Sequence, residues 1–310
     1  SLNSNFNSEI DLDENLIKKY NKFLNKNNLT KNIRNFKANL NNSFSINLDE
    51  TYKVKDYDYK ILGNIEKSKL HFLSDFKNRF ITEETNEIYL SNLKVQTTFS
   101  PKNITFKGDG EYSFNNKDFL KINIDNKLIG EFFNLKLNFD YANSLEIKLI
   151  NYKKSKNSIA NLSVDLEKKK NKININQVNY NEGNNFITID KLIFKDKKFF
   201  SFNKIRVNTN NNDFLIKNEN TIKIKGNKFD ATNLIKLFDG KSGDNKFQSL
   251  NGNIEIDFKN IKVPMSEKLE NFKLIGEIKK GKFVKISSKG DFGGNNFLDI
   301  SMKKEKTTDK

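Results

Sequence analysis

The stretch FNLKLNFDY, residues 133–141, alternates without a break between apolar and polar side chains. Successive side chains of a β-strand point to opposite faces, so Phe133, Leu135, Leu137, Phe139 and Tyr141 would share one face. A helix would instead need apolar residues at a period near 3.6, which this stretch does not have. The stretch therefore predicts a strand with one apolar face and one face in water.

The same alternation recurs along most of the chain, with Lys, Asn, Asp, Ser and Thr at the positions between. Its apolar members are Phe44, Ile46 and Leu48; Leu93, Val95, Thr97 and Phe99; Leu120, Ile122 and Ile124; Leu145, Ile147 and Leu149; Leu162, Val164 and Leu166; Ile173 and Ile175; Ile222 and Ile224; and Ile254, Ile256 and Phe258. Clusters such as 108–110 and 210–212 indicate turns between these runs. We therefore expect an all-β protein, a long twisted antiparallel sheet of repeated hairpins that curves into an open groove.

Two segments are predicted to be helices. Residues 13–26 place their apolar side chains on one helical stripe, and Asp13 can act as the N-cap. Residues 232–239 form a shorter segment of the same kind, which Asp230 or Thr232 can cap and Gly240 can end.

The chain has few apolar side chains for its length of 310 residues. Hydrophobic residues make up 35%, against about 45–50% in ordinary globular domains, where Gly is also counted. The 28 Phe residues nevertheless exclude disorder. No Pro-, Ser- or Gly-rich linker divides the chain, and Pro101 and Pro264 fall between the runs. We therefore expect residues 1–310 to be one continuous β-groove segment of a larger protein, with its apolar residues gathered on a limited surface.

The residue types needed for most enzyme chemistry are absent or isolated. The chain has no cysteine and a single histidine, His71, so thiol catalysis, a His-based triad and a two-His metal site are excluded. The acidic pair Glu83-Glu84 lies in a polar stretch typical of a solvated loop. The sequence thus predicts a protein that is not an enzyme of any Cys-, His- or metal-dependent kind.

The net charge of +16 comes almost entirely from lysine, because arginine occurs only at Arg34, Arg79 and Arg206. Proteins that read nucleic acids specifically depend on the bidentate guanidinium group of arginine. We therefore expect no nucleic-acid partner. Lysine attracts anionic lipid headgroups without specificity. The lysine runs at 153–156, 168–172 and 195–198 are typical of solvated turns.

Two distant segments resemble each other. Residues 59–70, YKILGNIEKSKL, match residues 272–283, FKLIGEIKKGKF. Gly226, Gly252 and Gly276 also recur at intervals about as long as a hairpin, which indicates stacked units.

Residues 222–238, IKIKGNKFDATNLIKLF, resemble the AsmA-like superfamily of Gram-negative bacteria in its large, YhdP-type branch. In that branch a short helix follows a strand of the form Ile-x-Gly-x-x-Phe-Asp-Ala, here Ile224, Gly226 and residues 229–231. The stretches at 250–256 and 290–294 continue the pattern. The resemblance covers residues 160–302 best and residues 1–90, with the helix near 13–26, only loosely.

The resemblance implies a periplasmic protein of the cell envelope, anchored in the inner membrane by a helix outside this segment. Such a protein conducts phospholipid along a β groove toward the outer membrane, with outer-membrane or periplasmic partners. The resemblance implies no catalytic residues and no cofactor, and hence a protein that is not an enzyme.

Physical chemistry leads to a similar expectation, because a large apolar sheet face must be covered. The residues expected to line a lipid groove are Phe133, Leu135, Leu137, Phe139, Tyr141, Leu145, Ile147, Leu162, Val164, Ile173, Ile175, Ile222, Ile224, Ile254, Ile256 and Phe258. The alternative is a structural or adhesive β-solenoid whose own side chains fill its core and which binds no ligand.

Overall fold

The computed structural model describes residues 1–23, 32–72, 85–233, 249–264 and 268–304. The chain is an all-β protein, and within the described residues α1 (Glu14–Phe23) is its one α-helix. It divides into two compact units. The N-terminal unit comprises Ser1–Asn143 and Asn161–Lys170, and the C-terminal unit comprises Ser144–Ala160 and Asn171–Lys310. Each is described by itself.

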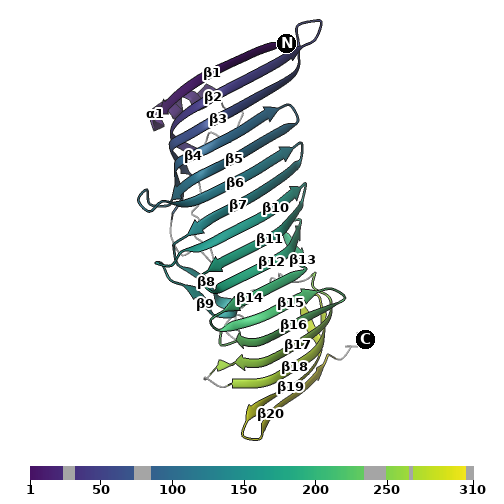
Figure 1. Ribbon diagram of the computed structural model, residues 1–310. Coiled ribbons are helices and arrows are strands. Elements are labelled where there is room, and N and C mark those ends of the chain that lie inside the picture. Colours follow the sequence, from purple (N-terminus) through teal and green to yellow (C-terminus); the bar gives the residue numbers. More distant parts are fainter. Residues whose placement is uncertain (24–31, 73–84, 234–248, 265–267, 305–310) are drawn as a thin grey trace. The chain divides into compact units, whose positions relative to one another are not determined.

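In the N-terminal unit each strand pairs antiparallel with the next strand along the chain, from β1 to β7 (Figure 1). These strands are β1 (Leu2–Leu12), β2 (Ile33–Leu48), β3 (Val54–His71), β4 (Glu87–Ser100), β5 (Asn103–Ser113), β6 (Leu120–Ile129) and β7 (Phe132–Tyr141). β10 (Ala160–Lys169) pairs with β7. The Asn161 side chain of β10 donates hydrogen bonds to Asn138 and Asp140 of β7, which places Asn161 on the polar face.

The C-terminal unit is a sheet of the same kind with one exception. Its strands are β11 (Lys172–Glu182), β12 (Asn185–Lys195), β13 (Lys198–Ser201), β14 (Lys204–Thr209), β15 (Asn212–Asn218), β16 (Thr221–Asp230), β17 (Gly252–Lys262), β18 (Lys268–Lys279), β19 (Lys282–Gly293) and β20 (Asn296–Lys303). β16 and β17 run parallel, whereas the other paired neighbours run antiparallel. The expectation of an antiparallel sheet is wrong at this pair, because Asn253 near the start of β17 lies opposite Thr221, the first residue of β16.

A small hairpin stands apart from the main sheet of the C-terminal unit. β8 (Leu145–Ile147) and β9 (Tyr152–Lys154) pair with each other and are joined by the 3₁₀ turn Lys148–Ile150. Asn151 ends this turn in the left-handed conformation, with a φ of 46°. The predicted alternation through Leu149 is therefore wrong, because the strand ends at Ile147 and Leu149 is exposed.

Three strands contain a non-glycine residue with left-handed backbone: Asn92 in β4, Lys191 in β12 and Asn271 in β18, with φ values of 48°, 53° and 48°. The apolar residues on either side of each one are three positions apart in the sequence, instead of the two positions of regular alternation. In β18, for example, Phe272 and Leu269 lie on either side of Asn271 and face the same way, since both lie opposite apolar residues of β17. A residue of this conformation within a strand locally increases the twist and bends the strand.

The first predicted helix is confirmed, with bounds Glu14–Phe23 inside the expected 13–26. Asp13 caps it as expected, because its Oδ1 accepts a hydrogen bond of 2.8 Å from the backbone N–H of Leu16. Ile17 is buried, and α1 contacts β1 and β2. The second predicted helix, 232–239, lies outside the described residues from position 234 onward.

Two further expectations are wrong. Residues 108–110 lie inside β5 rather than in a turn, because Gly108 and Gly110 are both paired with β6. The matched segments 59–70 and 272–283 are not equivalent, since the first lies wholly within β3 and the second spans β18, a turn and the start of β19. Gly226, Gly252 and Gly276 lie in three successive strands, not in successive hairpins.

Candidate functional site

In the N-terminal unit the apolar residues of neighbouring strands lie opposite one another. Leu137 of β7 pairs with Ile124 of β6, which pairs on its other side with Gly108 of β5. The row continues through Val95, Gly63 and Leu40. Parallel rows on the same face contain Phe133, Leu128, Ile104, Phe99, Tyr59 and Phe44; Leu135, Asn126, Phe106, Thr97 and Ile61; and Phe139, Ile122 and Gly110. Cross-strand pairing thus joins the apolar sides of the strands into one face.

The two faces of this sheet differ in exposure. Leu93, Val95 and Thr97 of β4 are buried, with Leu93 only 1% exposed, whereas Lys94 and Gln96 between them are exposed. Tyr112 and Tyr141 at the ends of β5 and β7 are each 3% exposed. The opposite face is therefore the solvated one, as the alternation predicts.

The C-terminal unit has an apolar face of the same construction. One row crosses it without a break in pairing from β11 to β20. Its members are Val178, Ile189, Ile205, Ile216, Ile224, Ile256, Leu274, Ser288 and Ile300. A neighbouring row contains Tyr180, Ile187, Val207, Phe214, Gly226, Phe258 and Phe272. Ile222, Ile254 and Ile278 form a buried cluster beside these rows, against which Phe202 and Leu250 pack.

Aromatic rings cover the backbone of the second row. Phe214, Phe229 and Phe258 contact one another, with ring centroids 5.5–5.9 Å apart. Gly226 lies beneath them, and a Cβ placed there would lie 2.7 Å from the Phe258 ring and 2.4 Å from the Asp213 carbonyl oxygen. The absence of a side chain at Gly226 is thus what allows the rings to lie on the strand.

The described elements form a single layer in the N-terminal unit. Apart from minor contacts, the described strands contact only their neighbours in the sheet, and α1 contacts β1 and β2. Among the described residues of this unit, no second sheet packs over the apolar face.

In the C-terminal unit the β8–β9 hairpin covers one end of the apolar face. Tyr152 of β9 packs edge-on against Tyr180 of β11, with centroids 5.7 Å apart. Tyr180 and Tyr152 are linked through their hydroxyls at 2.6 Å, and Tyr152 donates to the carboxylate of Glu182. Burial raises the pKa of Tyr180 to about 12, and burial together with the Glu182 carboxylate raises the pKa of Tyr152 well above its usual value. Both phenols therefore stay neutral hydrogen-bonding groups at physiological pH.

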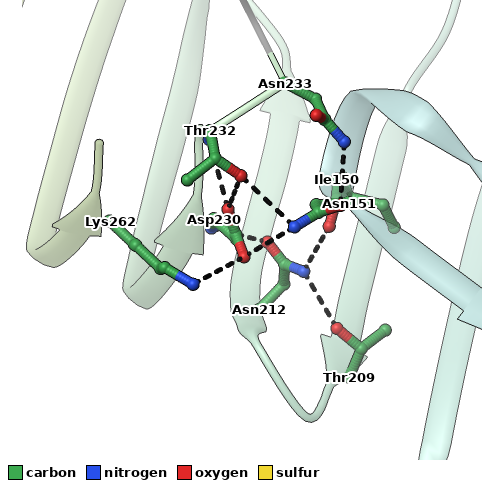
Figure 2. A network of polar contacts seen from close by, with 8 residues as sticks. All are labelled: Ile150, Asn151, Thr209, Asn212, Asp230, Thr232, Asn233 and Lys262. Atoms are coloured by element: carbon green, nitrogen blue, oxygen red, sulfur yellow. Dashed lines mark hydrogen bonds and ion pairs between the residues drawn. The ribbon is translucent and has the colours of Figure 1, made fainter. Parts of the chain in front are cut away.

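A second polar network fastens the same hairpin to β15 and β16 (Figure 2). Asn212, which is fully buried, donates from its side chain to the Ile150 carbonyl at 2.7 Å, and its Oδ1 accepts from the Asp230 backbone N–H at 2.9 Å. Asn151 donates to Asp230 Oδ2 at 3.0 Å. The ammonium of Lys262 lies 3.8 Å from the same oxygen.

The carboxylate of Asp230 is almost completely buried, yet its pKa is lowered. Burial alone would raise that pKa. Hydrogen bonds from Thr232 and Asn151 outweigh burial, and Lys262 adds to their effect. The network thus holds a charged group in place and fastens the hairpin onto the sheet.

The structure places most of the predicted lining residues on the two apolar faces. Those of β7 and β10 lie on the face of the N-terminal unit: Phe133, Leu135, Leu137, Phe139, Tyr141, Leu162 and Val164. Ile173, Ile175, Ile222, Ile224, Ile254, Ile256 and Phe258 lie on the face of the C-terminal unit. Leu145 and Ile147 belong to the β8–β9 hairpin and do not lie in the main sheet. Whether any of these residues contacts lipid stays a prediction.

Sequence reasoning missed many residues of the same faces. Examples are Tyr112, Phe214 and Phe229, and the pairs beyond a left-handed residue, such as Ile187 and Ile189. A strict period of two does not link Ile187 and Ile189 to Leu192 and Phe194, which lie across the left-handed Lys191. A pattern in which two alternating pairs are separated by a three-residue step would have found them.

No helix in the described part of the chain is long and apolar enough to span a membrane. Within the same residues no three His, Asp or Glu side chains come together as metal ligands would. Comparison with models of protein families, with characterised proteins and with solved structures gave no match.

Proposed function

We propose that the chain is a segment of a lipid-transfer protein in which phospholipid acyl chains lie along the apolar sheet faces. The observation that carries this proposal is the row of residues, apolar except for Ser288, that crosses all the main strands from β11 to β20 except the short β13. The N-terminal unit has a counterpart of this row. Such a face offers acyl chains many equivalent positions and no single tight site.

The energetics favour this use of the face. Burial of hydrocarbon is worth about 0.8 kcal/mol per methylene, so two tails with about thirty methylenes would cost on the order of 20 kcal/mol to draw through water. A wall of Ile, Leu and Phe side chains replaces the bilayer interior and removes most of that cost. The lipid in turn covers apolar surface that the described part of the N-terminal unit leaves without a second layer.

The structural or adhesive β-solenoid has less support. Coils of a solenoid stack parallel strands at a short, regular period, whereas the paired neighbours from β1 to β7 and from β11 to β20 run antiparallel except at β16–β17. Strand lengths also vary widely, up to 18 residues in β3.

The setting of this function is proposed from the AsmA-like resemblance alone. It would be the periplasm, with an inner-membrane anchor outside this segment and partners in the envelope. In this proposal the chain has no catalytic role and needs no cofactor.

Native mass spectrometry of the chain purified without detergent tests the proposal. We expect phospholipid masses bound to the protein, and uptake of lipid from phosphatidylcholine vesicles by protein stripped of lipid. A chain that is folded by circular dichroism yet carries no lipid and takes none up would contradict the proposal.

A matched pair of variants in β7 tests whether lipid uptake depends on the apolar face and not on the polar face. Leu137 lies on the apolar face opposite Ile124, and its neighbour Lys136 lies on the polar face opposite Asp125. Leu137→Gln should lower lipid uptake several-fold, because it places an amide in the path of the acyl chains, whereas Lys136→Gln should leave uptake near the unmodified level. Equal uptake by the two variants would refute a one-sided lipid path.

A further inference from the structure

Lysines gather at one end of the strands in the C-terminal unit. The turns at this end join β12 to β13, β13 to β14, β15 to β16 and β18 to β19, and β11 also begins there. We call this end the basic rim; its lysines, all exposed, are Lys172, Lys195, Lys197, Lys198, Lys204, Lys217, Lys279, Lys280 and Lys282. The acidic residues in these turns and strand ends are Asp196 and Glu219; Asp190 lies opposite Lys204, and Glu277 lies nearby and pairs with Lys279 at 2.8 Å.

The pairing register sets these lysines directly against one another. Lys195 lies opposite Lys172 on one side and Lys198 on the other. Lys204 lies opposite Lys217, and Lys279 lies opposite Lys282. Like charges directly opposite in a sheet are destabilising, so the stability of the free protein does not explain this arrangement.

The other ends of the same strands are built differently. There Asp213 is paired with Arg206 and lies opposite Lys228. Lys262 and Lys268 do lie opposite each other, but they form ion pairs with Asp230 and Glu270. Cations at that end are thus offset by nearby carboxylates. At the basic rim Lys204 and Lys279 also have a carboxylate beside them, Asp190 and Glu277. The row of Lys172, Lys195 and Lys198 has no ion pair among the described residues, and this uncompensated row is a feature of the basic rim.

Hydrogen bonds between the turns hold the basic rim together. The backbone N–H of Asp196 donates to the Asn171 carbonyl, that of Asn218 to Asn203, and that of Gly281 to Leu250. The side chain of Ser249 donates to the Phe199 carbonyl at 2.8 Å. Adjacent turns are therefore fixed beside one another, and their lysines act as one array.

The basic rim adjoins the apolar face and carries exposed aromatic residues. The buried cluster of Ile222, Ile254 and Ile278 lies at the same strand ends. Phe200 follows Lys198 in β13 and is 53% exposed, and Phe283 follows Lys282 in β19 and is 38% exposed. Lysine interspersed with exposed Phe beside an apolar wall is typical of surfaces that bind at the headgroup level of a membrane.

We propose that the basic rim docks the C-terminal unit onto the surface of a membrane rich in anionic phospholipid. The phosphates would neutralise the facing lysines, and Phe200 and Phe283 would enter the headgroup region. This deepens the proposed lipid transfer by naming the surface where lipid would enter or leave, but the docking does not require that acyl chains travel along the sheet.

Vesicle flotation tests the docking. The full chain is mixed with vesicles of phosphatidylcholine alone or of phosphatidylcholine and phosphatidylglycerol in equal amounts. The rim variant is Lys195→Gln/Lys198→Gln/Lys282→Gln. Its control, Lys225→Gln/Lys259→Gln/Lys273→Gln, removes the same charge from exposed positions in the middle of β16, β17 and β18.

We expect binding to the anionic vesicles that weakens with salt, and little binding to the neutral ones. Each lysine near an anionic surface contributes about 1 kcal/mol, so the rim variant should bind on the order of a hundredfold more weakly and the control far less so. Equal loss in both variants, or equal binding to both kinds of vesicle, would overturn the proposal. Binding to a single-stranded oligonucleotide that the rim variant loses, without binding to vesicles, would assign the rim to nucleic acid instead.

Measurements of thermal unfolding and of lipid content distinguish a failure of the docking proposal from a failure of the proposed lipid path. Relief of lysine repulsion should leave the rim variant at least as stable as the control at low salt, and a clear loss of stability would contradict the inferred repulsion. The rim variant should still carry the lipid detected by native mass spectrometry. Docking without bound lipid would support the rim and refute the lipid path, and bound lipid without docking would do the reverse.

Discussion

Gly226 lies where the backbone of β16 meets the rings of Phe214, Phe229 and Phe258. Gly226→Ala would place a methyl group within 2.6 Å of Phe214 Cβ and 2.4 Å of the Asp213 carbonyl oxygen. The backbone or the ring cluster would have to shift to make room for the methyl group, and overpacking of this kind lowers the free energy of unfolding by about 1–3 kcal/mol. We expect a loss of that size in urea unfolding, and almost no loss for the neighbouring exposed Lys225→Ala. A Gly226→Ala chain as stable as the unmodified one would show that the rings do not pack as described.

The Asp230 network predicts a particular response to acid. The pKa of Asp230 is lowered in the folded chain, so its stabilising effect is fully present above the unfolded value of about 3.9 and is lost as the pH falls through the lower folded value. Asp230→Asn should cost about 1–3 kcal/mol at neutral pH, because it leaves buried partners poorly matched. It should also flatten the fall in stability below about pH 4.

Chemical unfolding across this pH range measures both effects. Asp299→Asn is the control, because Asp299 is an exposed residue whose carboxylate lies 3.6 Å from Lys289, and surface pairs contribute about 0–1 kcal/mol. Parallel pH profiles for the unmodified chain and Asp230→Asn would argue against a charged, stabilising Asp230.

At the scale of the strand, the left-handed residues are the feature that sets which side chains share a face. Asn271 has a φ of 48°, a conformation that Asn and Gly adopt readily and β-branched residues do not. Without it, Leu269 and Phe272 of β18 would point to opposite sides.

Substitutions at Asn271 test this role. Asn271→Gly should change the unfolding free energy little, whereas Asn271→Val should lower it by about 1–2 kcal/mol because of backbone strain. Differential scanning calorimetry measures both. If Val and Gly were tolerated equally, the strand would not need the left-handed conformation at this position.

At the scale of the whole chain, the contacts predict local rather than global responses. Described strands contact their sheet neighbours almost exclusively, which resembles the nearest-neighbour energetics of repeat proteins. Leu93, in β4, is only 1% exposed, and removal of such a side chain costs about 2–5 kcal/mol. Leu93→Ala should therefore speed amide hydrogen exchange in β3, β4 and β5 and leave β17, β18 and β19 unchanged. Faster exchange throughout would indicate one cooperative unit instead.

Local pattern was enough to predict the class of the fold, because alternation between side chains is a property of a few adjacent residues. Residues 133–141 form β7 with the expected apolar face, and Asp13 caps α1 as expected, since a cap needs only the residues of the first helical turn. The composition likewise indicated a chain with too few apolar residues for an ordinary two-sided core.

Features that depend on contacts between residues distant in the sequence could not be predicted from local pattern. Strand register placed Lys195 between Lys172 and Lys198, made β16 parallel to β17, and aligned Ile224 with Ile256. Asn212 and Asp230 acquired their importance only by meeting the turn at Ile150 and Asn151. The neighbours of a residue in the chain determine which face of the strand its side chain lies on. Which residues lie opposite it on neighbouring strands, whether one of them carries the same charge, and which element covers it all depend on hydrogen bonds between strands. Only the three-dimensional fold brings those strands together.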